Sequence, residues 1–133
     1  MTAFESRYES IRERIDGAAS RSGRKSSGIA LMAVTKTRQV MELEEAWEAG
    51  IRLFGENRVQ EAAEKIVAWP PVKVADWRLI GHLQRNKARK AVALFSRIES
   101  LDRLELALEL QRILEEKEER MDTLIEVNTS GEA

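Results

Sequence analysis

The sequence predicts an α/β fold in which parallel strands alternate with helices. Short apolar runs of strand length, bounded by glycine or polar residues, recur along the 133-residue chain, and segments with helical periodicity separate them. Strands joined by helical connections run parallel, because each connection returns the chain to the same end of the sheet. The length suits one domain, and an apolar content of 43% is enough for a core.

A helix is expected first, over residues 2–22. Apolar residues recur along it at spacings of three and four, with arginine and glutamate between them. Thr2 followed by Glu5 has the spacing of a capping box, and Gly23 is placed to end the helix. A polar loop then leads to the first strand.

The first strand is predicted at residues 29–34, an unbroken apolar run that is typical of a strand buried on both faces. Lys36 stands at its carboxyl end, where parallel sheets bind ligands, so it is the candidate reactive residue. A lysine amine titrates near ~10.4 in water, but a partly buried one loses its proton more easily and forms an imine with an aldehyde. The alternative is a rim lysine that pairs with Glu56.

The remaining chain repeats a pattern of strand and helix. Asn57 and Asp102 are each placed to cap a helix, and Asp102 with Glu105 forms a second capping box. The last helix is expected to bury Leu104 and Leu108. The further strands are expected at residues 51–55, 77–82, 97–100 and 123–128, and the helices at 40–49, 57–69, 86–95 and 102–120.

This order leaves two parallel architectures, a doubly wound sheet or a barrel. No G-x-G-x-x-G or G-x-x-x-x-G-K-[ST] motif follows a strand, so the sequence favours a (β/α) TIM-barrel-type fold. An eight-stranded barrel needs ~250 residues. Five strands cannot close, so the first and fifth are expected to be open edges. Either residues 1–133 are a partial barrel domain lacking its C-terminal strands, or a second chain covers the edges by self-association.

Polar side chains follow every predicted strand, at the same edge of the sheet. Five such groups in register favour a shared site, although any strand must end in something polar. They are Lys36, Glu56, Asn57, His82, Ser100, Asp102, Asn128 and Thr129.

His82 is the sole histidine, so no second imidazole supports a metal site, and it is alternatively a capping or core-edge residue. Gly81 beside it permits close approach of a planar ligand. The basic run from Arg85 to Lys90 is predicted as a solvated helix face, with phosphate contact as the alternative. The tryptophans are expected to be packing residues.

Composition excludes several classes of protein. The net charge of −1 provides no field for nucleic acid or an anionic membrane. The chain has no cysteine, which excludes disulfides and thiolate metal sites. No window approaches the ~20 apolar residues of a membrane span. A soluble, cytoplasmic protein is expected.

Five segments carry a family resemblance. They are A-V-T-K-T-R (33–38), R-L-F-G-E-N-R-V-Q-E (52–61), W-R-L-I-G-H-L-Q-R-N-K (77–87), I-E-S-L-D (98–102) and I-E-V-N-T-S-G-E (125–132). In this order they closely resemble the pyridoxal-phosphate homeostasis proteins (the YggS/PLPBP type), which are single-domain relatives of the alanine racemase barrel.

The resemblance implies that Lys36 carries pyridoxal 5'-phosphate as a Schiff base. It also implies that Asn57, His82, Ser100 and Asn128 line the pocket around the pyridine ring. The family is taken to bind and buffer the cofactor without turnover. Racemases of this fold use a tyrosine from a second domain as the opposing base, whereas the only tyrosine here is Tyr8.

Family members continue through further strands, which supply the groups that hold the phosphate. The 133-residue chain is therefore expected to bind the cofactor weakly or not at all as a monomer. Two alternatives stand beside this reading. One is a fragment of a racemase- or lyase-like enzyme, and the other is a self-associating scaffold with a vestigial pocket.

Overall fold

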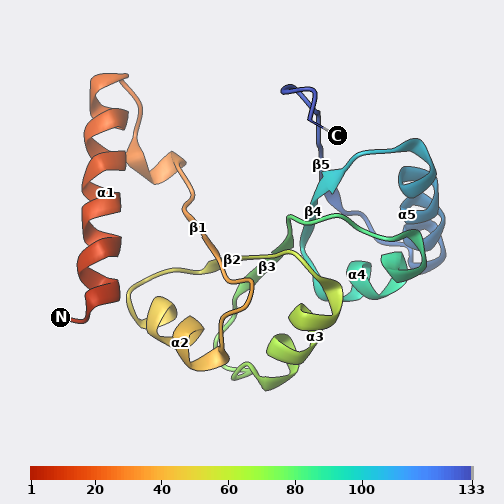
Figure 1. Cartoon of the computed structure of the whole chain (residues 1–133), viewed down its shortest axis with the longest axis horizontal. Coiled ribbons are helices and arrows are strands. Elements are labelled where there is room, and N and C mark those ends of the chain that lie inside the picture. The colour runs from red at the N-terminus through yellow and green to blue at the C-terminus, as the bar shows by residue number, and fades with distance from the viewer. Residues whose placement is uncertain (133) are drawn as a thin grey trace.

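The computed structural model describes residues 1–132 and contains one sheet of five parallel strands in the order β1-β2-β3-β4-β5. Helices α2 to α5 lie along one face of this curved sheet (Figure 1). A doubly wound sheet reverses its strand order and carries helices on both faces, so the sequential order confirms the predicted section of a barrel. The strands are β1 (Met32–Val34), β2 (Leu53–Glu56), β3 (Asp76–Leu79), β4 (Arg97–Leu101) and β5 (Asp122–Ile125).

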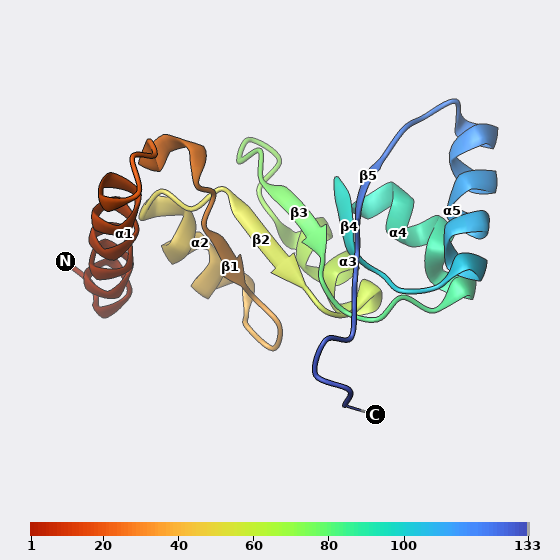
Figure 2. The same ribbon diagram turned by 90° about the horizontal axis from the view of Figure 1, so that it is seen from above.

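The helices follow the predicted order with shifted ends. Figure 2 shows α1 beside α2 at one end of the sheet and α5 at the other. No helix among residues 1–132 is long and apolar enough to cross a bilayer. The α-helices are α1 (Ala3–Arg21), α2 (Val40–Glu48), α3 (Val59–Ala68), α4 (Ala88–Leu94) and α5 (Leu104–Lys117), and the 3₁₀ turns are η1 (Ser26–Gly28) and η2 (Arg85–Lys87).

The core lies between the sheet and α2 to α5, and aromatic rings fill its centre. Phe54 is fully buried, with its ring centroid 5.2 Å from that of Trp77 and 5.5 Å from that of Trp69. Trp47 contacts Trp69 edge to face. Such pairs stabilise a core beyond the area they bury. The prediction that the tryptophans are packing residues is confirmed.

The opposite face of the sheet is open. Met32 and Ile80 cover Gly55 there, and a Cβ at Gly55 would lie 2.5 Å from the Met32 sulfur. Val34 is 52% exposed at the end of β1. The prediction of a first strand buried on both faces is therefore wrong, because helices cover only one face of the sheet.

The first capping box is confirmed, and the other two caps are not. The Thr2 hydroxyl accepts from the Glu5 N–H at 3.1 Å, and the Glu5 carboxylate accepts from the Thr2 N–H at 2.6 Å. Residues 58 and 103, each one position later than predicted, precede α3 and α5, and neither makes a side-chain cap. Asn57 and Asp102 thus belong to the strand-end loops.

The predicted buried face of α5 is also wrong. Leu104 and Leu108 are 73% and 60% exposed, whereas Leu106, Leu110 and Ile113 are buried. Leucines at every second position from 104 to 110 support two helical faces equally well, and packing against α4 selects the second.

Candidate functional site

The carboxyl ends of β1 to β4 lie side by side. Strand register pairs Val34 with Gly55, Glu56 with Leu79, and Leu79 with Ile98, so these strands end at similar heights. The residues that follow them therefore occupy one edge of the sheet. This edge is where α/β folds assemble sites from loops.

Lys36 lies in the turn after β1 and is exposed. The Thr35 N–H donates to the Gly55 carbonyl at 2.9 Å, which continues the strand pairing by one residue. Within residues 1–132, Lys36 makes no hydrogen bond or ion pair. Two expectations are corrected here: Lys36 is not partly buried, because β1 is an edge, and it does not pair with Glu56.

The partner of Glu56 is Lys65 of α3, which the sequence analysis missed. Lys65 is 6% exposed, and its ammonium lies 2.7 Å from Glu56 Oε1 and 2.8 Å from Glu61 Oε1. It also donates to the Thr35 carbonyl at 2.5 Å. An ammonium has three N–H donors, so these three acceptors satisfy it completely. The i,i+4 spacing of Glu61 and Lys65 was the available signal.

Glu56 is fully buried at the end of β2. Its Oε1 accepts from the Thr35 hydroxyl and from Lys65, while its Oε2 has no hydrogen-bond partner within residues 1–132. A buried carboxylate needs such compensation, because removing its charge from water is costly. The hydrogen bond from Lys65 is also the main cause that lowers the pKa of Glu61, with burial opposing it and the Thr37 N–H adding to it.

Asn57, His82 and Ser100 lie close together at the ends of β2, β3 and β4. A Cβ at Gly81 would lie 2.2 Å from the Asn57 carbonyl oxygen, so only glycine allows this approach. The buried Ser100 hydroxyl donates to the Gly81 carbonyl at 2.6 Å. The glycine at position 81 is therefore required by the close contact between two strand ends. The approach of a planar ligand, for which Gly81 was predicted, is not needed to explain it.

Asn57 and His82 line one cavity of about 400 Å³, together with the first turn of α3 and η2. The His82 side chain is 65% exposed, and its Nδ1 lies 3.5 Å from Asp102 Oδ2. Burial alone would raise the pKa of Asp102, but Arg103, at 2.7 Å, and His82 together lower it. Arg103 also donates to the Leu83 carbonyl at 2.7 Å. These bonds tie the loop after β3 to the loop after β4.

Asn128 does not join this group within residues 1–132. Its Oδ1 accepts from the Gly131 N–H at 2.9 Å, and its Nδ2 donates to the Glu132 carbonyl at 2.6 Å. The segment after β5 extends away from the sheet (Figure 1). Asn128 is thus exposed and bonded to its own neighbours.

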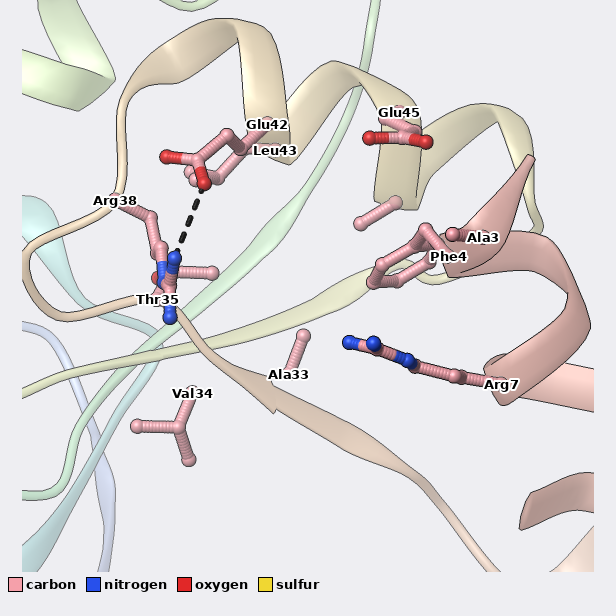
Figure 3. A pocket seen from close by; sticks show the side chains of 11 residues that line it. Ala3, Phe4, Arg7, Ala33, Val34, Thr35, Arg38, Glu42, Leu43 and Glu45 are labelled. Atoms are coloured by element: carbon pink, nitrogen blue, oxygen red, sulfur yellow. Dashed lines mark hydrogen bonds and ion pairs between the residues drawn. The ribbon is translucent and has the colours of Figure 1, made fainter.

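A second cavity, of about 390 Å³, lies between α1, β1 and α2 (Figure 3). Phe4, Ala33 and Leu43 form apolar walls, and Arg7 extends toward Ala33. Arg38 and Glu42 are paired at 3.2 Å on its rim. The sequence pattern does not predict this cavity, because the cavity depends on how α1 packs against β1 and α2.

The basic run mostly forms a solvated face, as predicted. Arg85 lies 3.8 Å from Glu109, and Arg89 lies 2.6 Å from Glu116, both on α5. No cluster of three or more metal-ligating side chains occurs in the described part of the chain.

No family model matches the chain, but individual proteins do. The pyridoxal phosphate homeostasis protein of Vibrio cholerae is 38% identical over 136 residues, which cover 100% of this chain and 58% of that protein. The Escherichia coli protein of the same name is 38% identical over 124 residues, covering 92% of this chain and 53% of that protein.

Solved structures show the same fold. PipY of Synechococcus elongatus with PLP bound superposes with a TM-score of 0.75 at 40% identity, covering 92% of this chain and 57% of PipY. An unknown protein from Bifidobacterium adolescentis superposes with a TM-score of 0.83 at 32% identity, covering 99% of this chain and 59% of that protein. The chain spans little more than half the length of the V. cholerae and E. coli proteins. By sequence, motif order and fold, it belongs to the pyridoxal phosphate homeostasis protein family.

Proposed function

We propose that the chain binds pyridoxal 5'-phosphate through a Schiff base on Lys36 and serves to hold this cofactor without turning over a substrate. The observation that carries the proposal is the contrast between two neighbouring amines. Lys65 is buried with three acceptors, whereas Lys36 lies unpaired at the strand-end edge, within residues 1–132. An amine must be free of such partners to attack an aldehyde.

The family supports the same chemistry. Relatives carry the name pyridoxal phosphate homeostasis protein, and PipY has been solved with PLP bound. The strand-end groups fit a planar, polar cofactor, because Asn57 and His82 share one cavity and the imidazole, which Asp102 contacts at Nδ1, is 65% exposed. Ser100 contributes by holding the Gly81 carbonyl. Asn128, which the family resemblance places in the pocket, is bonded to Gly131 and Glu132 and does not line this cavity within residues 1–132.

We infer that the affinity of residues 1–133 alone is weak. Lys36 is exposed, so nothing in the described chain encloses the reacting amine. Charge-assisted contacts are the strong ones in holding a phosphate, and PipY extends well beyond the 57% of its length that this chain covers. The chain is thus proposed as one part of a larger cofactor-binding domain.

Reduction with borohydride tests the proposal, because it converts a Schiff base to a stable amine. The chain is incubated with pyridoxal phosphate, reduced and digested, and the labelled peptide is identified by mass. We expect label on Lys36, loss of that label in Lys36→Ala, and unchanged label in Lys25→Ala, a matched exposed lysine. Equal labelling of all exposed lysines would show that Lys36 is not selected.

Catalysis as a racemase or lyase is the first alternative, and it requires an acid–base partner opposite Lys36. Tyr8 lies in α1, with its hydroxyl 3.7 Å from the Cβ position of Gly50, just before β2. That position belongs to the amino-terminal end of the sheet, away from the Lys36 turn. Racemisation of an amino acid above background, abolished in Lys36→Ala, would establish this alternative instead.

Self-association is a second role that specific observations favour. β1 and β5 each have one neighbour in the sheet, and Val34, Ile125 and Val127 near these edges are 52%, 75% and 68% exposed. Unpaired strand edges with exposed apolar residues are templates for pairing. Light scattering across a concentration series measures this directly, and a monomer at all concentrations would eliminate it.

A further inference from the structure

The turn that carries Lys36 is anchored on both sides of that residue. Thr35 precedes it and is bonded through its N–H and hydroxyl to β2, and through its carbonyl to Lys65. Arg38 donates its N–H to the Thr35 carbonyl at 3.1 Å, and Gln39 donates its N–H to Glu42 at 2.8 Å. Of residues 35 to 39, Lys36 is the one without a recorded hydrogen bond in the described chain.

Thr37 has an unusual backbone conformation, with φ of 63°. This left-handed region is disfavoured for a β-branched residue, so it persists only where surrounding contacts hold it. The contact in this case is Glu61, whose Oε1 accepts the Thr37 N–H at 2.5 Å across 24 residues of sequence. The same oxygen accepts from Lys65 at 2.8 Å.

We propose that Glu61 is the positioning residue of Lys36, a role that rests on the proposed Schiff-base function. Its carboxylate joins the buried Lys65 to the Thr37 N–H, and thereby fixes the chain reversal directly after Lys36. Lys65 in turn is held by Glu56 at the end of β2. The direction in which Lys36 leaves the turn is thus set from α3 and β2, through side chains that contact neither Lys36 nor a ligand.

The inference distinguishes Glu61 from its neighbours on α3. Glu64 is exposed, and its recorded contact is a bond from Gln60 at 3.2 Å within the same helix. Glu64 lines the same hollow as Thr37 but makes no hydrogen bond to the turn in the described chain, so its removal takes the same charge from the same helix and leaves the bonds of the turn in place. Glu61→Gln retains an oxygen that accepts the Thr37 N–H, so it should restore the turn, whereas Glu61→Ala should not.

Two measurements test this on the full chain. The first is amide hydrogen exchange of Thr37, which should become at least about tenfold faster in Glu61→Ala, because the amide loses its acceptor. The second is reductive labelling with pyridoxal phosphate, scored as the ratio of Lys36 to Lys25 in one sample. This ratio should fall at least about threefold in Glu61→Ala, because effective concentration depends on orientation. Glu64→Ala should match the wild type in both.

The outcomes separate the two proposals. Wild-type labelling without preference for Lys36 over Lys25 would overturn the proposed function, and the exchange rate of Thr37 would still decide whether Glu61 holds the turn. Preferential labelling of Lys36 that persists in a folded Glu61→Ala chain would overturn the positioning role. If that variant does not fold by circular dichroism, Glu61→Asp provides the test, since it keeps the charge near Lys65 but shortens the reach to Thr37.

Discussion

Replacing Lys65 with methionine should lower the free energy of unfolding by about 3–5 kcal/mol, the range for removing one partner of a buried ion pair. The two side chains are 7% and 0% exposed, and the ammonium lies 2.7 Å from Glu56 Oε1. Methionine has a similar length and no charge, so α3 keeps its packing while Glu56 loses its cation. The Thr35 hydroxyl then remains as the recorded donor to that carboxylate within residues 1–132.

Urea unfolding followed by tryptophan fluorescence measures this change, because Trp69 and Trp77 lie in the core. The matched control is Lys90→Met, which removes an exposed lysine bonded to Gln60 at 2.9 Å and should change stability by less than about 0.5 kcal/mol. The double variant Lys65→Met with Glu56→Leu should recover most of the loss, since an apolar pair replaces a buried ionic one at little cost.

If Lys65→Met lowered the free energy of unfolding by less than about 1 kcal/mol, this account would be refuted, because surface substitutions cause changes of that size. The same conclusion would follow if the double variant were less stable than the single one. Glu56 would then not need the ammonium of Lys65, and the anchoring of the Lys36 turn could not depend on that ion pair.

Three further predictions concern single positions. The carboxylate of Glu61 has a pKa below its usual 4.5, so its contribution to the free energy of unfolding is complete above pH 4.5 and is lost as the pH falls through the lowered pKa. The free energy of unfolding, measured in urea from pH 6 to 3, should therefore fall with pH, and the fall should be smaller in Glu61→Gln. Gly81→Ala places a Cβ 2.2 Å from the Asn57 carbonyl and should cost about 1–3 kcal/mol by urea unfolding, and a neutral result would mean that the two strand ends separate freely. Leu106→Ala should cost about 2–5 kcal/mol and Leu104→Ala less than about 0.5, and the reverse order would contradict the α5 packing.

Local patterns predicted the fold well, because they act over a few residues. The capping box at Thr2 and Glu5 depends on one turn of helix, and strand and helix alternation depends on apolar periodicity. The first and fifth strands were predicted to be edges because five strands are too few to close a barrel, and the structure confirms this. The predicted caps at Asn57 and Asp102 failed, because the tertiary contacts of the strand-end loops decide where each helix begins.

The candidate site was predicted in part, for a related reason. The positions of the strand ends predicted Lys36, Asn57, His82 and Ser100, and the structure places these residues at the carboxyl ends of four adjoining strands. Lys65 was missed, because a lysine on an amphipathic helix is ordinarily solvated and its burial depends on how α3 packs against the ends of β1 and β2, where Thr35 and Glu56 bind it.

The pairing of charges at this edge explains why one lysine is free. The carboxylates of Glu56 and Glu61 and the carbonyl of Thr35 lie beside the turn and need a cation. Lys65 of α3 provides that cation. If Lys36 supplied it instead, its amine would be protonated and fully bonded, and it could not attack a carbonyl. Because Lys36 is exposed within residues 1–132, no enclosing wall selects it over other exposed lysines, and any selectivity toward an aldehyde must come from orientation. The buried network therefore has two consequences: it leaves the reactive amine unpaired, and it fixes the turn from which that amine projects.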